Sequence, residues 1–217
     1  MKTDKQLQHN VQAELEWEPS IDATQIGVTV SDGTVTLSGN VGTYLQKTHA
    51  EKVAKRVYGV CAVVNDITLR IPSQYERADG DISSAVHNSL SWDAQIDEKQ
   101  IKVNVKDGWV TLEGECHWKY QSDAAERHVR VLRGVKGVSN LIKIVPPVRT
   151  ADVTLKIEEA YRRSADLDAR RVHVEATDGK VILRGNVRSW AERMQAQQAA
   201  WAAPGVSQVE NLLTVSP

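Results

Sequence analysis

Several components that most globular proteins use are scarce in this sequence. It contains no phenylalanine, two methionines and two cysteines, and aromatic residues make up 5% of its 217 positions. The core must therefore be built mainly from valine, leucine, isoleucine and alanine. Cys61 and Cys116 belong to no Cys-x-x-Cys pair and to no Cys/His metal spacing, which excludes a disulfide scaffold and fits a reducing compartment.

Long apolar runs and an excess of charge of either sign are also absent. No stretch approaches the roughly 18 to 20 apolar residues that cross a bilayer as a helix. Lysine and arginine number 27 against 28 aspartates and glutamates, so no basic field is available to hold nucleic acid. The polar N-terminus has no apolar signal core and predicts a cytoplasmic protein, or a periplasmic one if the sequence is a processed form.

The same sequence unit recurs three times along the chain. Three octapeptides align without a gap, 75 and 71 residues apart: DGTVTLSG at 32–39, DGWVTLEG at 107–114 and DGKVILRG at 178–185. An aspartate precedes each octapeptide by ten residues, a glycine follows its last residue by twenty, and an asparagine comes six residues later. Constant spacings in three copies indicate tandem domains. We place these domains at residues 1–71, 79–145 and 150–217.

Each unit is expected to fold in the order helix, strand, strand, helix, strand. The first helix has an apolar residue at every fourth position and is preceded by an expected cap at Asp4, Asp79 or Thr150. The Asp-Gly pair predicts a two-residue type I′ hairpin, because both residues tolerate positive φ. The second helix is predicted at 44–58, 121–133 and 191–203, and the last strand at 63–70, 138–144 and 209–215.

The predicted fold class is mixed α/β (α+β), with three tandem units that each pack a three-stranded sheet against two helices. If the third strand runs parallel to the second, the connection should be right-handed, but the strand order is left open. The linker at 72–80 is longer than the Pro-Pro linker at 145–149, so the junction of the first two units is expected to be the looser hinge.

The recurring residues have structural explanations. Nine glycines are expected at turns, strand ends and helix ends: Gly33, Gly39, Gly59, Gly108, Gly114, Gly134, Gly179, Gly185 and Gly205. The repeated aspartates Asp22, Asp97 and Asp168 either cap the turn before the first strand or contribute to a ligand site.

The motif Asp-Gly-x-Val-x-Leu-x-Gly, followed by a helix and a Gly-Val step before the last strand, resembles the BON domain family, and the resemblance covers nearly the whole chain in three copies. Asn40-Val41 and Asn186-Val187 match the family's Gly-Asn-Val, whereas Glu115-Cys116 departs from it. The resemblance implies a small α/β module of envelope stress proteins, secretins, channels and haemolysins. It also implies phospholipid binding or protein holding without catalysis.

Motifs for catalysis are absent from the sequence. No Gly-x-Ser-x-Gly, P-loop or His-Glu-x-x-His pattern occurs, and none of the six histidines recurs at an equivalent position in the three units. Cys116 and His117 could form half a metal site, but no second pair stands nearby. We therefore expect no enzyme, no cofactor and no metal, unless Cys116, His117 and a distant carboxylate converge.

Aromatic side chains form the candidate interaction surface. Trp17 and Trp92 take equivalent positions at the end of the first helix, where they either pack over the sheet or contact a partner. Trp109 follows the Asp-Gly turn and should lie near the hairpin tip. Trp118 and Tyr120 lie beyond the other end of that strand, about 17 Å or more away, so they cannot share one patch with Trp109. Such residues suit contacts as rigid, amphipathic anchors.

We interpret the chain as a non-enzymatic, tandem BON-type binding protein of stressed bacterial cells. Weak sites on linked units gain avidity for other proteins or misfolded chains. A phospholipid-surface protein is the first alternative, although the near-zero charge of every unit disfavours it. A cytosolic ligand sensor or scaffold, with a pocket between units, is the second. No nucleic-acid partner is expected, and the oligomeric state is left open.

Overall fold

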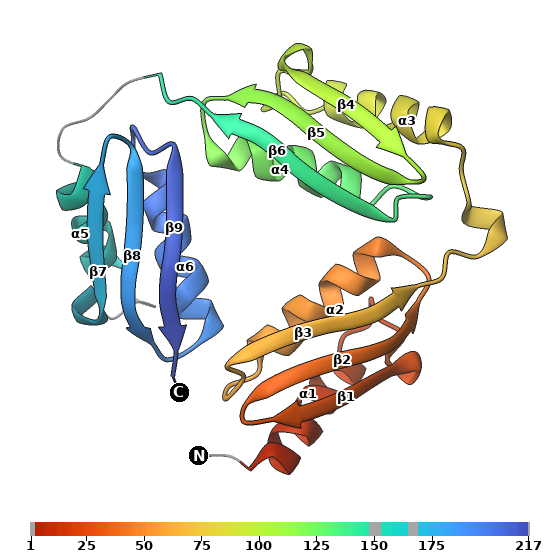
Figure 1. Ribbon diagram of the computed structural model, residues 1–217, viewed down its shortest axis with the longest axis horizontal. Coiled ribbons are helices and arrows are strands. Elements are labelled where there is room, and N and C mark those ends of the chain that lie inside the picture. Colours follow the sequence, from red (N-terminus) through yellow and green to blue (C-terminus); the bar gives the residue numbers. More distant parts are fainter. Residues whose placement is uncertain (1–2, 148–152, 165–168, 217) are drawn as a thin grey trace.

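The computed structural model describes residues 3–147, 153–164 and 169–216. It consists of three units, and each follows the predicted order of helix, two strands, helix and strand. In each sheet the strands lie in chain order, with the first two antiparallel and the last two parallel. Figure 1 shows the three units arranged around a common centre. The predicted fold class is confirmed, and the structure supplies the strand order.

The elements have the following bounds. Unit 1 contains α1 (Asp4–Trp17), β1 (Ile26–Ser31), β2 (Thr34–Val41), α2 (Tyr44–Arg56) and β3 (Ala62–Leu69). Unit 2 contains α3 (Asp79–Ser91), β4 (Ile101–Lys106), β5 (Trp109–Cys116), α4 (Lys119–Arg130) and β6 (Gly137–Ile144). Unit 3 contains α5 (Val153–Arg163), β7 (Val172–Thr177), β8 (Lys180–Val187), α6 (Trp190–Ala202) and β9 (Gln208–Val215).

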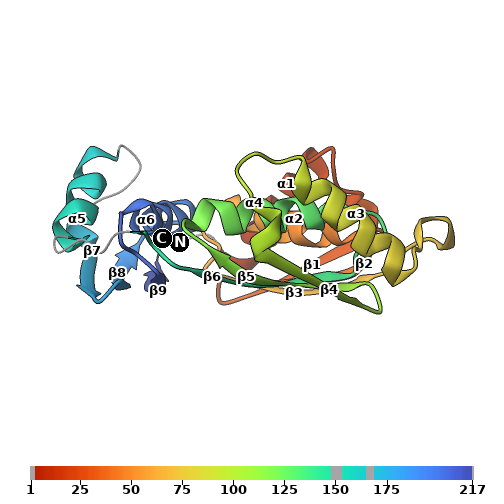
Figure 2. The same cartoon turned by 90° about the horizontal axis from the view of Figure 1, so that it is seen from above.

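Each unit has its own core between the two helices and one face of the sheet. In unit 1 this core contains Leu15, Leu37 and Ile67, which are almost completely buried. Separate clusters occupy the same place in units 2 and 3. Figure 2 shows the helices of units 1 and 2 on one side of their sheets and the strands on the other, so the second sheet face carries no helix.

The predicted Asp-Gly hairpins are confirmed. Asp32 and Gly33 have φ values of 49° and 74°, which a type I′ turn requires, and the other two Asp-Gly pairs have the same conformation. All nine glycines singled out in the sequence have positive φ. Gly39 was expected to end its strand, but β2 continues to Val41. A Cβ at Gly39 would lie 1.9 Å from the Gln25 carbonyl oxygen, so a side chain there cannot be accommodated.

The aspartates expected to cap the first helices have a different role. The N-cap residues are Thr3 and Ala78, one position earlier than predicted. The Asp79 carboxylate instead accepts hydrogen bonds from the backbone N–H groups of Asp107 and Gly108, both at 2.8 Å. Asp4 accepts equivalent bonds in unit 1. Each aspartate therefore ties a helix start to a hairpin turn. Thr150 lies outside the described residues.

The second helices begin earlier than predicted in two units, at Lys119 rather than residue 121 and at Trp190 rather than residue 191. In unit 2 the residue taken as the helical start, Gln121, is the third residue of the helix and caps it. Gln121 follows the first helical residue, Lys119, and its Oε1 accepts hydrogen bonds from the backbone N–H groups of His117 and Trp118, each at 3.1 Å. Such a side chain satisfies N–H groups that a helix start leaves free. The helix of unit 1 begins at Tyr44 as predicted.

The repeated asparagine fastens the last strand to the second helix. Asn140 Nδ2 donates to the Ser122 carbonyl oxygen at 3.0 Å, and its Oδ1 accepts from the Ile142 N–H at 3.2 Å. Asn65 and Asn211 make the same two contacts in their units. The amide thus satisfies an N–H of an edge strand that would otherwise be open to pairing.

The first linker packs against unit 2. The guanidinium of Arg133 lies 4.8 Å from the centroid of the Tyr75 ring, and a Cβ at Gly134 would lie 2.9 Å from the Arg77 Cβ. Much of the second linker lies outside the described residues, so the relative looseness of the two junctions stays a prediction.

Candidate binding surface

The second helices of the three units meet head to tail. Their first residues are Tyr44, Lys119 and Trp190, and their twelfth residues are Lys55, Arg130 and Trp201. Lys55 Nζ lies 4.7 Å from the Trp190 ring centroid, and Lys119 Nζ lies 5.8 Å from that of Trp201. Tyr44 packs against the core of unit 2. Each junction thus joins the start of one helix to another unit, which explains how α2, α4 and α6 come to face the centre (Figure 1).

Trp190 forms the tightest of these contacts. Although it begins α6, it packs against the hydrophobic core of unit 1. Its ring lies between two cations, because Arg193 approaches from its own helix at 4.9 Å while Lys55 approaches from α2. Burial lowers the pKa of Arg193, whose guanidinium also donates to the carbonyl oxygens of Asn211 and Leu213. The contact therefore combines apolar burial with cation–π attraction.

The remaining junction, between units 1 and 2, shows electrostatic coupling between α2 and α4. The pKa of Glu51 in α2 is lowered on balance: burial opposes the shift, and Lys55, Asn65 and Arg130 produce it. Arg130 belongs to α4 of unit 2, so its charge reaches the carboxylate of a neighbouring unit. Together with the packing of Tyr44 on the core of unit 2, this completes a ring of three junctions between the units.

A groove of about 780 Å³ lies between α4 and α6. We call it the α4–α6 groove. Its walls are formed by Trp118, Lys119, Tyr120, Asp123 and Arg127 of unit 2 and by Met194, Gln197, Gln198, Trp201 and Ala202 of unit 3. Trp201 also lines a second cavity of about 480 Å³, together with β6 and the start of β9. The junction of units 2 and 3 therefore contains two neighbouring cavities.

The chemistry of the α4–α6 groove suits apolar, adaptable partners. Lys119 and Asp123 form an ion pair with each other, and Arg127 adds one positive charge to the wall. Tyr120 and Met194 are both more than half exposed. Methionine and aromatic side chains repack around differently shaped apolar groups, and the neighbouring glutamines supply hydrogen bonds. The groove is therefore a candidate binding surface for groups of this kind.

The structure separates the predicted aromatic surface into three places. Trp118 and Tyr120 line the α4–α6 groove, while Trp109 lies on the helix-free face of the unit 2 sheet. Trp17 and Trp92 are 83% and 89% exposed at the ends of α1 and α3. The alternative in which they pack over the sheet is therefore wrong. The partners Met194 and Trp201 were missed, because no sequence spacing connects α6 to α4.

Cys116 and His117 do come near two carboxylates, around a cavity of about 50 Å³ that Asp97 and Glu115 also line. Burial raises the pKa of the Cys116 thiol, so the reactive thiolate is disfavoured. His117 Nδ1 lies 3.0 Å from the Val145 carbonyl oxygen, which can only accept, so this nitrogen carries a proton and cannot serve as a base. Among the described residues no cluster of three or more ligating side chains suits a metal ion.

A row of Ser89, His128 and Asp93 joins α3 to α4. Ser89 Oγ lies 3.3 Å from His128 Nδ1, and His128 Nε2 lies 2.8 Å from Asp93 Oδ2. A backbone hydrogen bond from Gln95 and the bond from His128 lower the pKa of Asp93. The order is that of a hydrolytic triad, but Ser89 lies inside α3, where the helix uses the backbone N–H groups that an oxyanion would need. These three side chains therefore form a hydrogen-bond network that connects α3 to α4.

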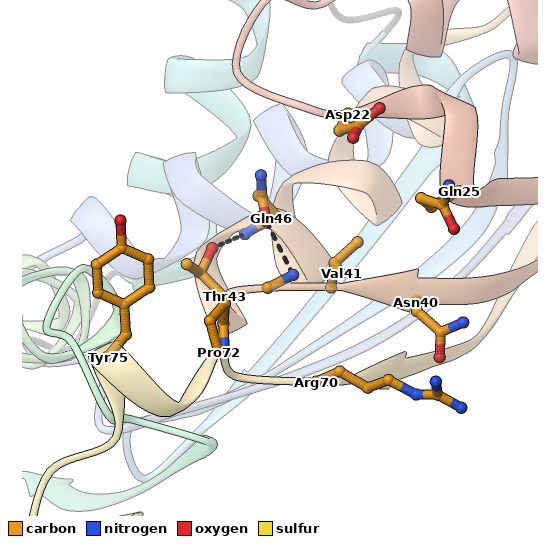
Figure 3. A pocket seen from close by; sticks show the side chains of 10 residues that line it. Asp22, Gln25, Asn40, Val41, Thr43, Gln46, Arg70, Pro72 and Tyr75 are labelled. Atoms are coloured by element: carbon orange, nitrogen blue, oxygen red, sulfur yellow. Dashed lines mark hydrogen bonds between the residues drawn. The ribbon is translucent and has the colours of Figure 1, made fainter.

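A cavity of about 390 Å³ at the start of α2 contains the first of the repeated aspartates (Figure 3). Asp22 Oδ1 accepts a hydrogen bond from the Thr24 N–H at 3.2 Å, and Asp97 Oδ1 accepts one from Lys99 N–H at the same distance. The predicted turn capping is thereby confirmed for two copies, and Asp168 lies outside the described residues. Gln46 binds the Gly42 N–H, while Arg70 and Tyr75 lie along the rim (Figure 3).

The protein thus consists of three small α+β modules, and helices of different modules together line the groove between them. Three consecutive segments of the chain, residues 3–71, 78–146 and 149–217, match the BON domain. The chain belongs to the BON domain family.

The chain is also similar to individual proteins. The chain is 33% identical over 144 residues to osmotically-inducible protein Y of Escherichia coli (strain K12), which covers 64% of this chain and 72% of that protein. Among solved structures, the C-terminal domain of CdsD, a structural protein of the type III secretion system of Chlamydia trachomatis, aligns over 100% of both chains at 16% identity, with a TM-score of 0.28. Within the described residues no helix has the length and apolarity needed to cross a bilayer.

Proposed function

We propose that this protein is a non-enzymatic, stress-related binding protein that holds apolar segments of other polypeptides in the α4–α6 groove. The observation that carries the proposal is the convergence of Trp118, Tyr120, Met194 and Trp201 from two units around a volume of about 780 Å³. Pockets of this size accommodate several side chains. Similarity to an osmotically inducible protein supports the assignment to stress.

The tandem arrangement supports weak, multivalent binding. The groove needs two units, so a single BON unit would not contain it. A long unfolded chain that occupies the groove could also contact exposed side chains elsewhere, such as Trp17 and Trp92. Linked weak contacts raise the apparent affinity without a strong individual site.

A charge placed in the groove tests the proposal. Met194 of α6 is 58% exposed, and Leu155 of α5 is 59% exposed but does not line the groove, which makes it a matched control. Met194→Glu should weaken binding of reduced, carboxymethylated α-lactalbumin about tenfold, since burial of an apolar side chain contributes about 1.5 kcal/mol. Leu155→Glu should leave the affinity unchanged. Equal effects of the two substitutions on fluorescence anisotropy titrations would contradict the proposal.

The second candidate function is binding to a phospholipid surface, which the exposure of Trp17 and Trp92 favours. Tryptophan side chains settle at the boundary between headgroups and acyl chains. Glu16, Glu18 and Asp93 are neighbours of the two tryptophans in the chain, so uncharged phosphatidylcholine vesicles should bind better than anionic ones. The double variant Trp17→Ala/Trp92→Ala should lose flotation with such vesicles, whereas Met194→Glu should retain it. Retention by both variants would remove this candidate.

A further inference from the structure

Trp109 is held in a defined orientation on the sheet of unit 2. Its Nε1 donates a hydrogen bond to Ser139 Oγ at 2.8 Å, and its six-membered ring covers Gly137 so closely that a Cβ there would lie 2.4 Å from Cζ3. Val110, the next residue of β5, points into the core, so the indole lies on the opposite, helix-free face. The indole is fixed at both ends against β6.

The residues under the indole are specific to unit 2. Trp109 and Gly137 pair directly in the β5–β6 register, whereas the equivalent pairs are Thr34 with Ala62 and Lys180 with Gln208. A glycine weakens a strand, and a covering aromatic ring compensates for that loss. This compensation explains why one face of the indole is packed on Gly137. Half of the Trp109 surface remains exposed and contributes nothing to the stability of the strand.

Charged side chains of both signs surround the exposed indole. Lys106 lies directly across from Trp109 on β4, and the Lys136 side chain passes over the turn, with its Cγ 3.2 Å from where a Gly108 Cβ would be. Asp107 of the same turn supplies a carboxylate. Further along the face, Lys102 lies opposite Glu113. These three lysines and two carboxylates leave a net charge of only one and offer both hydrogen-bond donors and acceptors, which complements a ligand rich in hydroxyl groups.

We propose that Trp109 is the stacking platform of a binding site for a neutral pyranose sugar. A pyranose ring with equatorial hydroxyls presents a flat face of C–H groups, which packs on an indole through dispersion. Its hydroxyls point outward toward Lys106, Asp107 and Lys136. The fixed indole loses no rotamer freedom on binding. One ring on one platform gives a dissociation constant of about 1 mM.

The indole N–H signals of the full-length protein test this site. Six tryptophans give six such signals in a proton–nitrogen correlation spectrum, and the Trp109 signal is identified by its loss in Trp109→Thr. Titration with cellohexaose should shift the Trp109 signal to saturation at millimolar concentration. Gly137→Ala retains the indole but displaces it, and should weaken binding at least fivefold. Trp92→Ala, at an exposed site on α3, should leave the titration unchanged.

Three outcomes would overturn the proposal. One is a Trp109 signal that does not move at millimolar cellohexaose. Another is the same sugar affinity in Trp109→Thr, measured by calorimetry, as in the unaltered chain. The third is a Trp109 signal that moves with an apolar peptide or with adenosine but not with cellohexaose, which would assign the platform to a different ligand. The site lies apart from the α4–α6 groove, so Met194→Glu should not affect the sugar titration.

Discussion

Lys55 of α2 lies over the ring of Trp190 of α6, with 4.7 Å between its Nζ and the ring centroid. The two residues belong to units 1 and 3, which are separated by a complete domain in the sequence. Trp190 packs against the core of unit 1 as well, so one side chain supplies both the apolar and the cation–π part of this junction. This contact closes the ring of second helices that creates the α4–α6 groove.

Trp190→Ala should therefore open the arrangement of the units. Loss of the buried indole and of its cation–π contact removes about 2 to 4 kcal/mol from the junction. We expect a larger radius of gyration in small-angle X-ray scattering and weaker polypeptide binding. Trp17→Ala, at a position 83% exposed, is the control and should change neither shape nor binding of a single groove-sized peptide. An unchanged scattering curve for Trp190→Ala would contradict this role.

Asp79→Ala should destabilise unit 2 by about 1 to 3 kcal/mol. The carboxylate accepts two hydrogen bonds from the hairpin turn, and charge-assisted bonds of this kind exceed neutral ones in strength. Asp81 lies in the same first turn of α3, and Asp81→Ala controls for the loss of charge near the helix start. Urea unfolding followed by circular dichroism measures both. If the two variants lose equal stability, the hairpin contact is not the cause.

Tyr161→Phe should reveal a buried phenol. The Tyr161 hydroxyl donates to the Ala196 carbonyl oxygen at 3.0 Å, so its removal costs about 1 kcal/mol at neutral pH. Burial raises the pKa of Tyr161 well above its ordinary value. The unfolded chain releases this proton near pH 10 while the folded chain retains it, so stability falls by about 1.4 kcal/mol per pH unit above that value.

The substitution should remove this part of the alkaline loss. Unfolding free energies of the two proteins, measured between pH 9 and about pH 11, should converge as the pH rises. The other tyrosines are common to both proteins and cancel in the comparison. Parallel pH profiles would show that the Tyr161 hydroxyl titrates normally in the folded state.

Asn140→Ala should cost unit 2 about 1 to 2 kcal/mol. It deletes the amide that joins β6 to the Ser122 carbonyl and leaves the Ile142 N–H without its side-chain acceptor. Leu141→Ala, at an exposed neighbouring position, should cost little. Hydrogen exchange of the Ile142 amide gives a direct readout, because protection there should fall in Asn140→Ala alone. Unchanged protection would refute the fastening role of this side chain.

Local structure was largely predictable from the sequence, and the reasons are visible in particular residues. Asp32 and Gly33 tolerate positive φ, so their dipeptide predicts a hairpin regardless of context. Asp79 shows where this reasoning failed: an aspartate at a helix start was expected to cap that helix, whereas its carboxylate reaches a turn 28 residues away. Long-range partners of a polar side chain leave no local pattern.

By itself the sequence determined three tandem units, their fold and the hairpin of each, because these follow from spacing, backbone preference and alternation of apolar residues within about 70 positions. Tertiary structure decided which aromatic residues act together. Trp118 and Tyr120 share a groove with Met194 and Trp201 only because the start of α4 lies near the end of α6, and the Trp109 indole lies flat only because Gly137 leaves room for it. Contacts of this kind depend on the shapes of two surfaces that are distant in the chain, and such shapes carry no periodic signal.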